Sequence, residues 1–384
     1  MIKVTNKNMC CGCSACVQVC PKHCIRLNDD KEGFAYPVVD ESSCVDCGLC
    51  ESVCPFVNQA DKALPIDVYA VKHSDDAVRM DSSSGGVFTL LAEQVIEEGG
   101  VVFGARFNDR WDVVHDYAET KDALKAFRGS KYVQSNITDT YKQAEAFLKS
   151  GRKVLFVGTP CQVAGLKKYL RHDYEKLIAV DFICHGVPSP KVWRRYLKEK
   201  IRVTRSNDSI VTSVDFRNKS TGWKKYSFSL SVSDGQNHYV QSSVYGDNEY
   251  MRAFLSNLSI RPSCYNCPAK SGKSGADLTV GDFWGVEKIL PELDDDKGLS
   301  IVIVNDSKCG KYLNEHDSGV RKVDFRESIH GNKSYESSSK RPINRDYFFH
   351  CIQKGYKLRD AVRACESMNV FSRMRRLIYR RLGV

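Results

Sequence analysis

The chain has 384 residues, enough for two or more folded units, and its 42% hydrophobic and 27% charged residues are typical of a globular protein. No apolar run approaches the roughly 18 residues of a membrane-spanning helix, and the first residues lack the apolar stretch of an export signal. We therefore expect a cytoplasmic protein. The formal net charge of +10 raises the question of nucleic-acid binding.

Ten of the 17 cysteines lie before residue 55, in tight groups. In a chain without an export signal, such groups are typical of metal ligands rather than of disulfides. Two groups show the spacing C-x2-C-x2-C-x3-C-P, which is typical of bacterial ferredoxins with two 4Fe–4S clusters. Three thiolates of one group surround a cluster, and the fourth cysteine reaches the other cluster. Residues 1–58 are therefore predicted to form a two-cluster ferredoxin domain.

The spacing assigns four ligands to each cluster. Cluster one is predicted to be held by Cys10, Cys13, Cys16 and Cys54. Cluster two is predicted to be held by Cys20, Cys44, Cys47 and Cys50. Cys11 and Cys24 do not fit this register, and we interpret them as spare thiols. The alternative is a pair of zinc sites, which two complete matches with both prolines disfavour.

From residue 66 onward, strand-like and helix-like stretches alternate, as is typical of an α/β domain. We expect strands over residues 67–71, 101–105, 153–157, 177–182 and 278–280. We expect helices over residues 87–98, from 160 to 170 and from 190 to 198. The turn Ser84-Gly85-Gly86 opens the first helix and offers free backbone N–H groups to a phosphate, although a capped helix start without a ligand explains it as well.

Two strand–helix units of this domain place a cysteine just after the strand. Cys161 follows the strand expected at residues 153–157, and Cys184 follows the one at 177–182. In open α/β sheets ligands bind at this edge, and the short connection between the two units favours neighbouring parallel strands. The pair Cys264 and Cys267 completes a four-thiolate set. We predict that this set holds a third 4Fe–4S cluster, with zinc as the alternative.

Bound iron–sulfur clusters would lower the net charge of the protein. A 4Fe–4S core with four thiolates carries about −2, so three clusters would lower the charge of +10 to about +4. We therefore expect no nucleic-acid partner.

Residues 331–384 are predicted to form a C-terminal helical extension. Five apolar side chains near its end fall on one side of a helix, with arginines mostly opposite: Phe371, Met374, Leu377, Ile378 and Leu382. Such a basic amphipathic tail is able to lie on an anionic membrane, so peripheral membrane contact is one candidate role. Docking on the protein's own surface is the simpler explanation.

The motifs of residues 65–305 resemble the beta subunit of coenzyme F420-reducing hydrogenase and its wider family of flavoprotein reductases. The shared motifs are Ser84-Gly85-Gly86-Val87, Gly129-Ser130-Lys131-Tyr132, Pro160-Cys161-Gln162, Cys184-His185-Gly186, and the pair Cys264 and Cys267 followed by residues 276–282. Some members of this family carry an added two-cluster ferredoxin segment, as this chain does. Arg217 and residues 222–225 look like the bacterial branch that accompanies surface-polysaccharide genes, which argues against deazaflavin use.

The resemblance implies an inner 4Fe–4S cluster and an FAD in this body. It makes Cys161, Cys184, Cys264 and Cys267 the cluster ligands. It implies that the FAD pyrophosphate is approached by Ser84, Gly85 and Gly86. It implies that the flavin site is lined by Lys131, Tyr132 and Ser135, and it adds Gly281 and Asp282 to the cofactor-binding residues.

The predicted fold is α/β with α+β features: a ferredoxin domain at 1–58, a reductase domain with a mixed sheet that binds FAD and iron–sulfur at 65–330, and the extension at 331–384. The predicted function is a FAD-dependent oxidoreductase that acts on an organic small molecule and exchanges electrons with a redox protein such as ferredoxin. No histidine or carboxylate stands out as a catalytic proton donor. The alternatives are an electron-transfer subunit that serves a separate catalytic protein, and a cluster-based sensor or structural protein.

Overall fold

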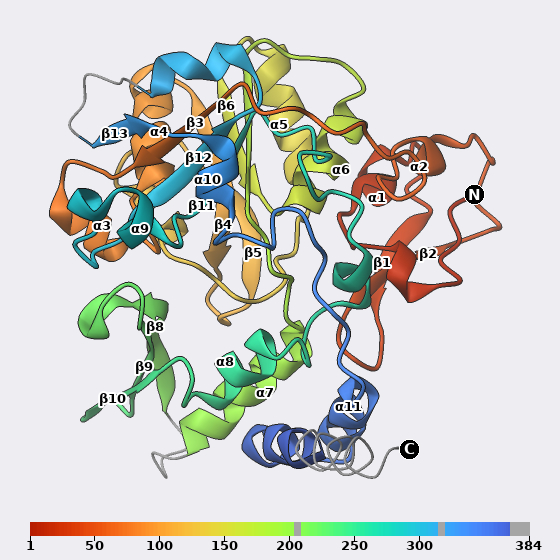
Figure 1. Cartoon of the computed structure of the whole chain (residues 1–384). Coiled ribbons are helices and arrows are strands. Elements are labelled where there is room, and N and C mark those ends of the chain that lie inside the picture. Colours follow the sequence, from red (N-terminus) through yellow and green to blue (C-terminus); the bar gives the residue numbers. More distant parts are fainter. Residues whose placement is uncertain (203–208, 314–318, 369–384) are drawn as a thin grey trace, which may run out of the picture.

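The computed structural model describes residues 1–202, 209–313 and 319–368. Its N-terminal unit contains α1 (Ala15–Val19), α2 (Leu49–Ser52) and an antiparallel hairpin of β1 (Ile25–Asp29) and β2 (Ala35–Val39). Figure 1 shows this unit, in red, on one side of a larger body. Each short helix carries the third cysteine of its motif and leads to the fourth.

The larger body is built on an eight-stranded mixed sheet in the order β13-β3-β12-β11-β7-β6-β4-β5. Its strands are β3 (Asp67–Val71), β4 (Val101–Phe107), β5 (Val113–Ala118), β6 (Val154–Gly158), β7 (Leu177–Phe182), β11 (Leu278–Asp282), β12 (Ser300–Val304) and β13 (Val320–Lys322). The neighbours β11, β7, β6 and β4 are parallel, and β3 runs in the same direction because β12 is antiparallel to both β3 and β11. The carboxyl ends of these five strands therefore lie at one edge, and the prediction of an α/β protein with a mixed sheet is confirmed.

Both faces of the central strands are buried, because successive side chains of a strand point to opposite sides. Three helices cover the sheet: α4 (Val87–Glu97), α5 (Thr140–Lys149) and α6 (Pro160–Leu170). Phe103 and Phe156 pack with α5 and α6 on one face, whereas Val102 and Leu155 pack with α4 on the other. Ala15 of α1 joins the first of these cores, so the N-terminal unit packs against the α5–α6 side.

A second, antiparallel sheet contains β8 (Ile210–Asn218), β9 (Ser227–Ser233) and β10 (His238–Val244). It shares a hydrophobic core with α7 (Pro190–Ile201), α8 (Glu249–Leu255) and α11 (Arg345–Gln353). Phe34 and Tyr36 of the N-terminal unit enter the same core, as do residues of the C-terminal segment up to Cys365. The amphipathic tail expected over residues 371–382 lies outside the described residues.

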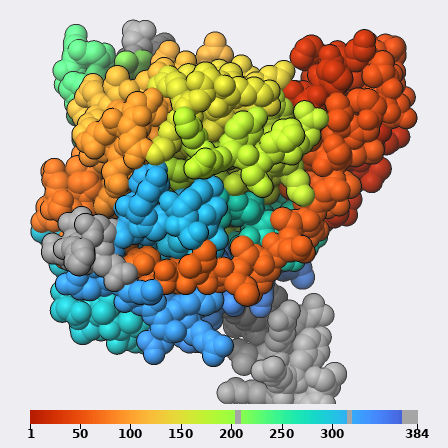
Figure 2. Space-filling model, turned by 90° about the horizontal axis from the view of Figure 1, so that it is seen from above, coloured from red at the N-terminus to blue at the C-terminus, as the bar shows by residue number. Residues whose placement is uncertain are grey.

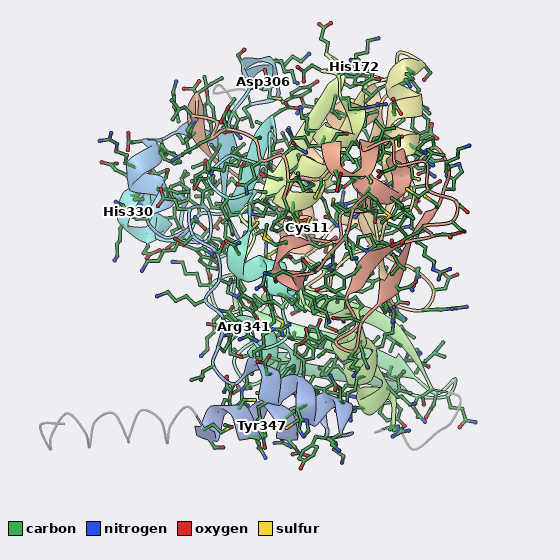
Figure 3. All side chains as sticks on the ribbon, turned by 90° about the vertical axis from the view of Figure 1, so that its right-hand side faces the viewer. Cys11, His172, Asp306, His330, Arg341 and Tyr347 are labelled. Atoms are coloured by element: carbon green, nitrogen blue, oxygen red, sulfur yellow. The ribbon has the colours of Figure 1, made fainter. Side chains whose placement is uncertain are left out.

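The remaining elements are short. They are α3 (Asp76–Asp81), α9 (Val286–Ile289), α10 (Phe325–Ile329) and the 3-10 helices η1 (Lys7–Met9), η2 (Ala123–Phe127), η4 (Lys219–Thr221), η5 (Pro262–Asn266), η6 (Pro291–Leu293) and η7 (Ser307–Tyr312). The connection from the N-terminal unit to β3 crosses the surface of the larger body, where Figure 2 shows it in orange. The Ile66 N–H donates to the Val304 carbonyl at 2.8 Å at the end of this connection. Figure 3 looks onto the N-terminal unit and labels Cys11 near the middle of the molecule in that view.

The elements expected from the sequence are present. The five expected strands correspond to β3, β4, β6, β7 and β11, and the three expected helices to α4, α6 and α7. The parallel pairing of the two cysteine-bearing strands is also confirmed, because β6 and β7 are parallel neighbours from Val154 opposite Leu177 to Gly158 opposite Asp181. In the described part of the chain, no helix combines the length and the apolarity that crossing a membrane requires.

Candidate iron–sulfur and flavin sites

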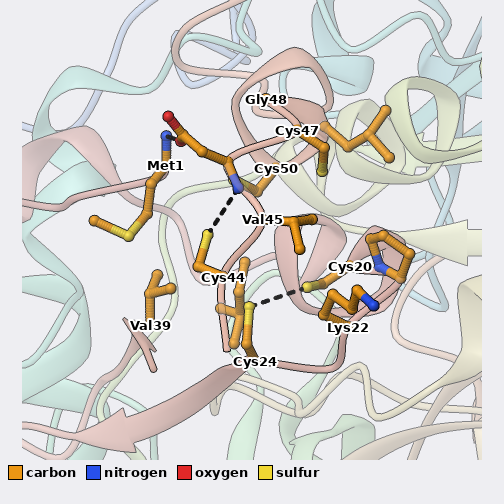
Figure 4. Close-up of a pocket in the computed structure, with 14 residues that line it drawn as sticks. Met1, Cys20, Lys22, Cys24, Val39, Cys44, Val45, Cys47, Gly48 and Cys50 are labelled. Atoms are coloured by element: carbon orange, nitrogen blue, oxygen red, sulfur yellow. Dashed lines mark hydrogen bonds and ion pairs between the residues drawn. The ribbon is translucent and has the colours of Figure 1, made fainter. Parts of the chain in front are cut away.

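The outer set of thiols, Cys20, Cys44, Cys47 and Cys50, lines one pocket of the N-terminal unit (Figure 4). These are the four cysteines that the spacing predicts for cluster two, with Cys20 coming from the first motif and the others from the second. Backbone N–H groups approach two of the sulfurs, from Ile2 to Cys50 Sγ at 3.2 Å and from Asp46 to Cys44 Sγ at 3.4 Å. Such donors stabilise a thiolate over a thiol.

Cys24, interpreted from the sequence as a spare thiol, lines the same pocket. Its Sγ lies 3.5 Å from that of Cys20, and it also approaches Cys44. The spacing pattern gave no sign of this position, because Cys24 enters the pocket as the residue before β1, not as part of a motif.

The middle set, Cys10, Cys13, Cys16 and Cys54, adjoins the outer set on one side and the larger body on the other. Burial, together with the neighbouring Cys10, Cys54 and Cys50, raises the pKa of Cys16 to about 12. Cys50 belongs to the outer set, so the two sets are close neighbours. Cys13 faces Gly165 of α6: a Cβ placed on Gly165 would lie 3.0 Å from Cys13 Sγ.

The inner set, Cys161, Cys184, Cys264 and Cys267, gathers at the carboxyl edge of the large sheet. Cys161 is the second residue of α6, directly after β6, and Cys184 comes two residues after β7. The turn after Cys184 packs against η5: the Val187 N–H lies 3.5 Å from Cys264 Sγ, and Pro188 forms a bridge with Ile260. Cys264 in η5 and Cys267 at the end of η5 are thereby brought to the carboxyl ends of β6 and β7.

The inner thiols are chemically suited to a cluster. Burial raises the pKa of Cys267 to about 11 and that of Cys264 to about 12. The pKa of Cys184 is also raised, mainly by burial and in part by the other three thiols of the set. Four half-buried thiols this close resist ionisation as free groups, and a metal cluster that takes their negative charge removes this obstacle.

The spread of the thiols bears on the zinc alternative. No three Cys, His, Asp or Glu side chains in the described ranges stand close enough together to share one metal ion. A 4Fe–4S cubane holds its four thiolates farther apart than a single zinc ion with bonds of about 2.3 Å does. Iron and zinc analysis of the same samples separates these two metals at the inner set.

Cys11 lies at the junction of the middle and inner sets and is buried. Its thiol adjoins those of Cys13 and Cys161, and this neighbour together with burial raises the pKa of Cys161 well above its usual value. The Cys11 carbonyl accepts a hydrogen bond from Gln134 at 3.0 Å. Sequence reasoning treated Cys11 as a spare thiol, and the only available signal was that it doubles Cys10 at the start of the motif.

The candidate pyrophosphate turn Ser84-Gly85-Gly86 lies between β12 and α4. The Gly85 N–H donates to Ser300 Oγ at 3.0 Å, and a Cβ at this position would meet the Val71 carbonyl oxygen at 2.2 Å, so the protein itself requires glycine here. Gly86 caps α4 with φ of 89°, and this capping residue offers no side chain to the first N–H groups of the helix. Ser83 and Ser130 are hydrogen bonded at 2.7 Å, which brings the turn to the Gly129–Tyr132 motif.

Tyr132 and Asp282 belong to one polar cluster that is centred on Arg217. The buried Arg217 guanidinium donates to both Asp282 oxygens at 3.1 and 3.2 Å and to the Tyr132 hydroxyl at 3.4 Å. Trp223 donates to Asp282 at 2.8 Å. Gly281, the residue before Asp282, has no room for a side chain because a Cβ would lie 2.7 Å from Ile183. The structure thus joins Asp282 to Arg217 and Trp223, which the sequence had treated as separate features.

Ser135 connects the candidate flavin residues to the inner set. Gln162, next to Cys161, donates to Ser135 Oγ at 2.8 Å, and Ser135 lies 3.0 Å from His115 Nδ1. His115 Nε2 lies 3.1 Å from the Val157 carbonyl. Since a carbonyl only accepts, the Nε2 of His115 carries the proton and its Nδ1 accepts the Ser135 O–H.

Three basic side chains around these residues are suited to bind an anionic group with many hydrogen-bond acceptors, such as FAD. Arg217 Nε is buried with no hydrogen-bond partner among the described residues. The Lys131 ammonium has three N–H groups and two carbonyl acceptors, Arg128 O at 2.8 Å and Gly129 O at 3.2 Å, and burial lowers its pKa to about 7. Lys219 is buried and donates to the Ser84 carbonyl at 2.9 Å, beside the candidate pyrophosphate turn. Their chemistry fits phosphate and flavin carbonyl oxygens.

Comparisons with known proteins identify the family of the chain. Residues 68–141 and 151–324 match the N-terminal and C-terminal models of the coenzyme F420 hydrogenase/dehydrogenase beta subunit, and residues 9–58 match a 4Fe–4S dicluster domain. The coenzyme F420-dependent sulfite reductase of Methanocaldococcus jannaschii is 26% identical over 184 residues, which are 45% of this chain and 28% of that protein. This chain therefore aligns with less than a third of that relative.

A chain in the solved structure of the F420-reducing NiFe hydrogenase complex of Methanosarcina barkeri is 15% identical, with a TM-score of 0.47. The match covers 80% of this chain and 92% of that chain. The two beta-subunit models cover both halves of the large sheet, including the ends of β6, β7 and β11, and the dicluster model covers the outer and middle sets. The chain thus belongs to the coenzyme F420 hydrogenase/dehydrogenase beta subunit family of iron–sulfur oxidoreductases, and it carries a 4Fe–4S dicluster domain at its N-terminal end.

Proposed function

We propose that the chain is an iron–sulfur flavoprotein oxidoreductase that passes electrons between 4Fe–4S clusters and FAD and so reduces or oxidises an organic substrate. The observation that carries this proposal is the continuity of three thiol sets. Cys50 of the outer set neighbours Cys16 of the middle set, and Cys11, which adjoins Cys13 of the middle set, also adjoins Cys161 of the inner set. Cys47 of the outer set is exposed, so a redox protein such as a ferredoxin has access to this end.

The other end of the series reaches the candidate flavin residues. Gln162 follows Cys161 and holds Ser135, which the family resemblance assigns to the flavin site. FAD, when bound, exchanges single electrons with clusters and a hydride with organic molecules. Lys131 and Arg217 would hold its acceptor oxygens with their unused N–H groups, and Lys219 would offset its pyrophosphate charge. The identity of the organic substrate is left open by these contacts.

The inner set is tested by iron analysis of the reconstituted full chain. We expect about twelve irons, and about eight in a variant with Cys161→Ala and Cys264→Ala, counting four per cubane. Cys309→Ala is the matched control, because Cys309 is buried in the core beneath the sheet and belongs to none of the three sets. Eight irons in the unchanged protein would refute the third cluster, and zinc measured in the same samples would identify the alternative.

FAD is tested by heating the reconstituted protein and measuring flavin fluorescence in the supernatant. We expect Lys131→Met to reduce the retained flavin, while Lys125→Met, an exposed lysine on η2, leaves it unchanged. Gly86 is unsuitable for this test, because its φ of 89° and a Cβ that would lie 2.9 Å from His73 make any substitution strained. A protein with all clusters and no flavin would contradict the flavoprotein proposal.

A second candidate function is an electron-transfer subunit that serves a separate catalytic protein. The family model describes a beta subunit, which favours a role inside an assembly. The two functions are separated by anaerobic assays of the purified chain alone. Turnover of nicotinamide, deazaflavin or another organic acceptor without an added protein supports the enzyme, and reduction that requires a partner protein supports the subunit.

A further inference from the structure

Two buried cations flank the inner set, and neither has a carboxylate partner among the described residues. Arg261 is fully buried, and its guanidinium donates to the carbonyls of Cys10 and Ala35, each at 2.8 Å, and to Gln134 Oε1 at 3.0 Å. Its Nη2 also lies 3.7 Å from Cys10 Sγ of the middle set. Through its own carbonyl, Arg261 accepts a hydrogen bond from the Cys264 N–H at 2.9 Å. It therefore stands between a thiol of the middle set and one of the inner set.

Lys270 lies on the opposite side of the inner set. It is buried three residues after Cys267, and its ammonium donates to the Cys184 carbonyl and, at 2.5 Å, to the Ser334 carbonyl. Its charge acts on Cys184 and Cys267, while that of Arg261 acts on Cys161 and Cys264. Each thiol of the inner set is thus within electrostatic reach of one of the two cations.

The other buried arginines differ from Arg261 because each has a carboxylate partner. Arg79, Arg217 and Arg345 each form an ion pair, with Asp295, Asp282 and Glu32 respectively. A buried charge is normally paired, because desolvation without a counter-charge is costly. Arg261 and Lys270 donate to carbonyl oxygens, and the Arg261 guanidinium also approaches Cys10 Sγ and lies over the rings of Phe34 and Tyr36. No carboxylate in the described part of the chain forms an ion pair with either side chain, so their positive charge is left to be balanced by something else. The neighbouring groups able to carry negative charge are the cysteines of the inner and middle sets and, for Lys270, the buried carboxyl group of Asp181, whose pKa burial raises to about 6.

We propose that Arg261 and Lys270 are the counter-cations of the inner cluster and raise its reduction potential above that of the outer cluster. The inference rests on the proposed third cluster. A 4Fe–4S cluster gains one negative charge on reduction, so a nearby fixed cation favours the reduced form. Two cations line the pocket of the outer set, the exposed Lys22 and the N-terminal ammonium of Met1, which is paired with the carboxylates of Asp46 and Glu51. Solvent screens the charge of Lys22, and the two carboxylates offset that of Met1, so the outer cluster has the lower potential and electrons that enter there move inward.

The proposal is tested by redox titration of the reconstituted full chain, followed by electron paramagnetic resonance. Lys270→Met is expected to lower the potential of the inner cluster alone, whereas Arg261→Met is expected to lower those of the inner and middle clusters. We expect at least a tenfold change in the equilibrium constant for reduction, which is about 59 mV for one electron. Lys273→Met is the matched control, since it removes the same charge from the same loop at a half-buried position. Lys273→Met is expected to leave the reduction potentials of all three clusters unchanged.

Variants that keep the charge complete the test. Lys270→Arg and Arg261→Lys are expected to keep potentials close to those of the unchanged protein. If Lys270→Met loses the inner irons and Lys270→Arg keeps them, the need for the charge is supported; loss in both would overturn the proposal in favour of a packing role. Unchanged potentials in both methionine variants would also overturn it. A protein that holds only about eight irons before any substitution would instead refute the proposed third cluster.

Discussion

Cys13 of the middle set packs directly against Gly165 of α6. A Cβ built on Gly165 would lie 2.9 Å from Cys13 Cβ and 2.9 Å from the Tyr141 hydroxyl. Gly165 lies one helical turn after Cys161, so the missing side chain brings the middle set against the helix that starts at the inner set. This close approach explains a glycine inside a helix, where it normally costs about 1 kcal/mol relative to alanine.

Gly165→Ala is therefore expected to destabilise the protein, although alanine is the better helix former. Crowding of a packed interior typically costs about 1–3 kcal/mol, which exceeds the gain in helix propensity. The melting temperature should fall, and iron in the middle set should be lost first because Cys13 has to move. Gly310→Ala is the control, since a Cβ there would meet no atom within 4 Å. A Gly165→Ala protein as stable as the control, with about twelve irons, would show that the contact is unimportant.

Cys11 and Cys24 are expected to be dispensable for cluster assembly. The three sets supply twelve thiols without them, so Cys11→Ala and Cys24→Ala should each keep about twelve irons. Cys11→Ala should still change the spectrum of the inner cluster, because it removes the thiol that adjoins Cys161. About eight irons in either variant would make that cysteine a ligand and would reassign one set.

Local patterns predict well where Cys161 and Cys184 lie. Each follows an apolar strand, and the strand–helix–strand connection between them leaves little choice but parallel neighbours, as β6 and β7 are. The position of Arg261 follows from no such rule. Its partner Cys10 is 251 residues away in the sequence, and their contact depends on how the N-terminal unit docks on the larger body.

The order of strands in the large sheet could not be predicted from the sequence either. The strand β12 lies between β3 and β11, although it follows both in the chain, and no periodicity within residues 300–304 announces this insertion. Because of it, Ser84 and Gly85 bond to Leu299 and Ser300, and the pyrophosphate turn acquires partners that its own sequence does not reveal. These contacts depend on which strands pair in the folded sheet. The sequence did not reveal this pairing, because an apolar run shows only that a strand is buried.

Removal of one partner of the ion pair between Arg217 and Asp282 is expected to destabilise the protein strongly, because Arg217 is buried. Asp282→Asn would leave the guanidinium charge buried without a counter-charge, at a cost of about 3–5 kcal/mol. Urea unfolding should show this loss, and a second change, Arg217→Met, should restore part of it by removing the unpaired charge. Glu97→Gln serves as the control, because its pair with Lys121 is exposed and worth about 1 kcal/mol or less. Equal losses for Asp282→Asn and Glu97→Gln would contradict this account.

His115 is buried beneath the candidate flavin site in its neutral form. Burial lowers its pKa from 6.5 to about 4. Its Nε2–H and Nδ1 are both used, by the Val157 carbonyl and the Ser135 hydroxyl, so a second proton on Nδ1 would break the bond that Ser135 donates. In the unfolded chain the same ring takes up a proton below about pH 6.5.

His115 is therefore expected to make the protein acid-sensitive in a defined window. Between about pH 6.5 and about pH 4 the unfolded state binds one more proton than the folded state, so stability falls as the pH is lowered. The full loss across this window is on the order of 3 kcal/mol. The measurement is the slope of the unfolding free energy against pH, compared with that of His115→Gln, where the contribution should disappear even if the variant is less stable throughout. His172→Gln, at an exposed position, should keep the slope of the unchanged protein. If His115→Gln and His172→Gln keep equal slopes between pH 6.5 and pH 4, then His115 does not cause the acid sensitivity, and the hydrogen-bond chain from Gln162 through Ser135 to His115 does not depend on a neutral ring.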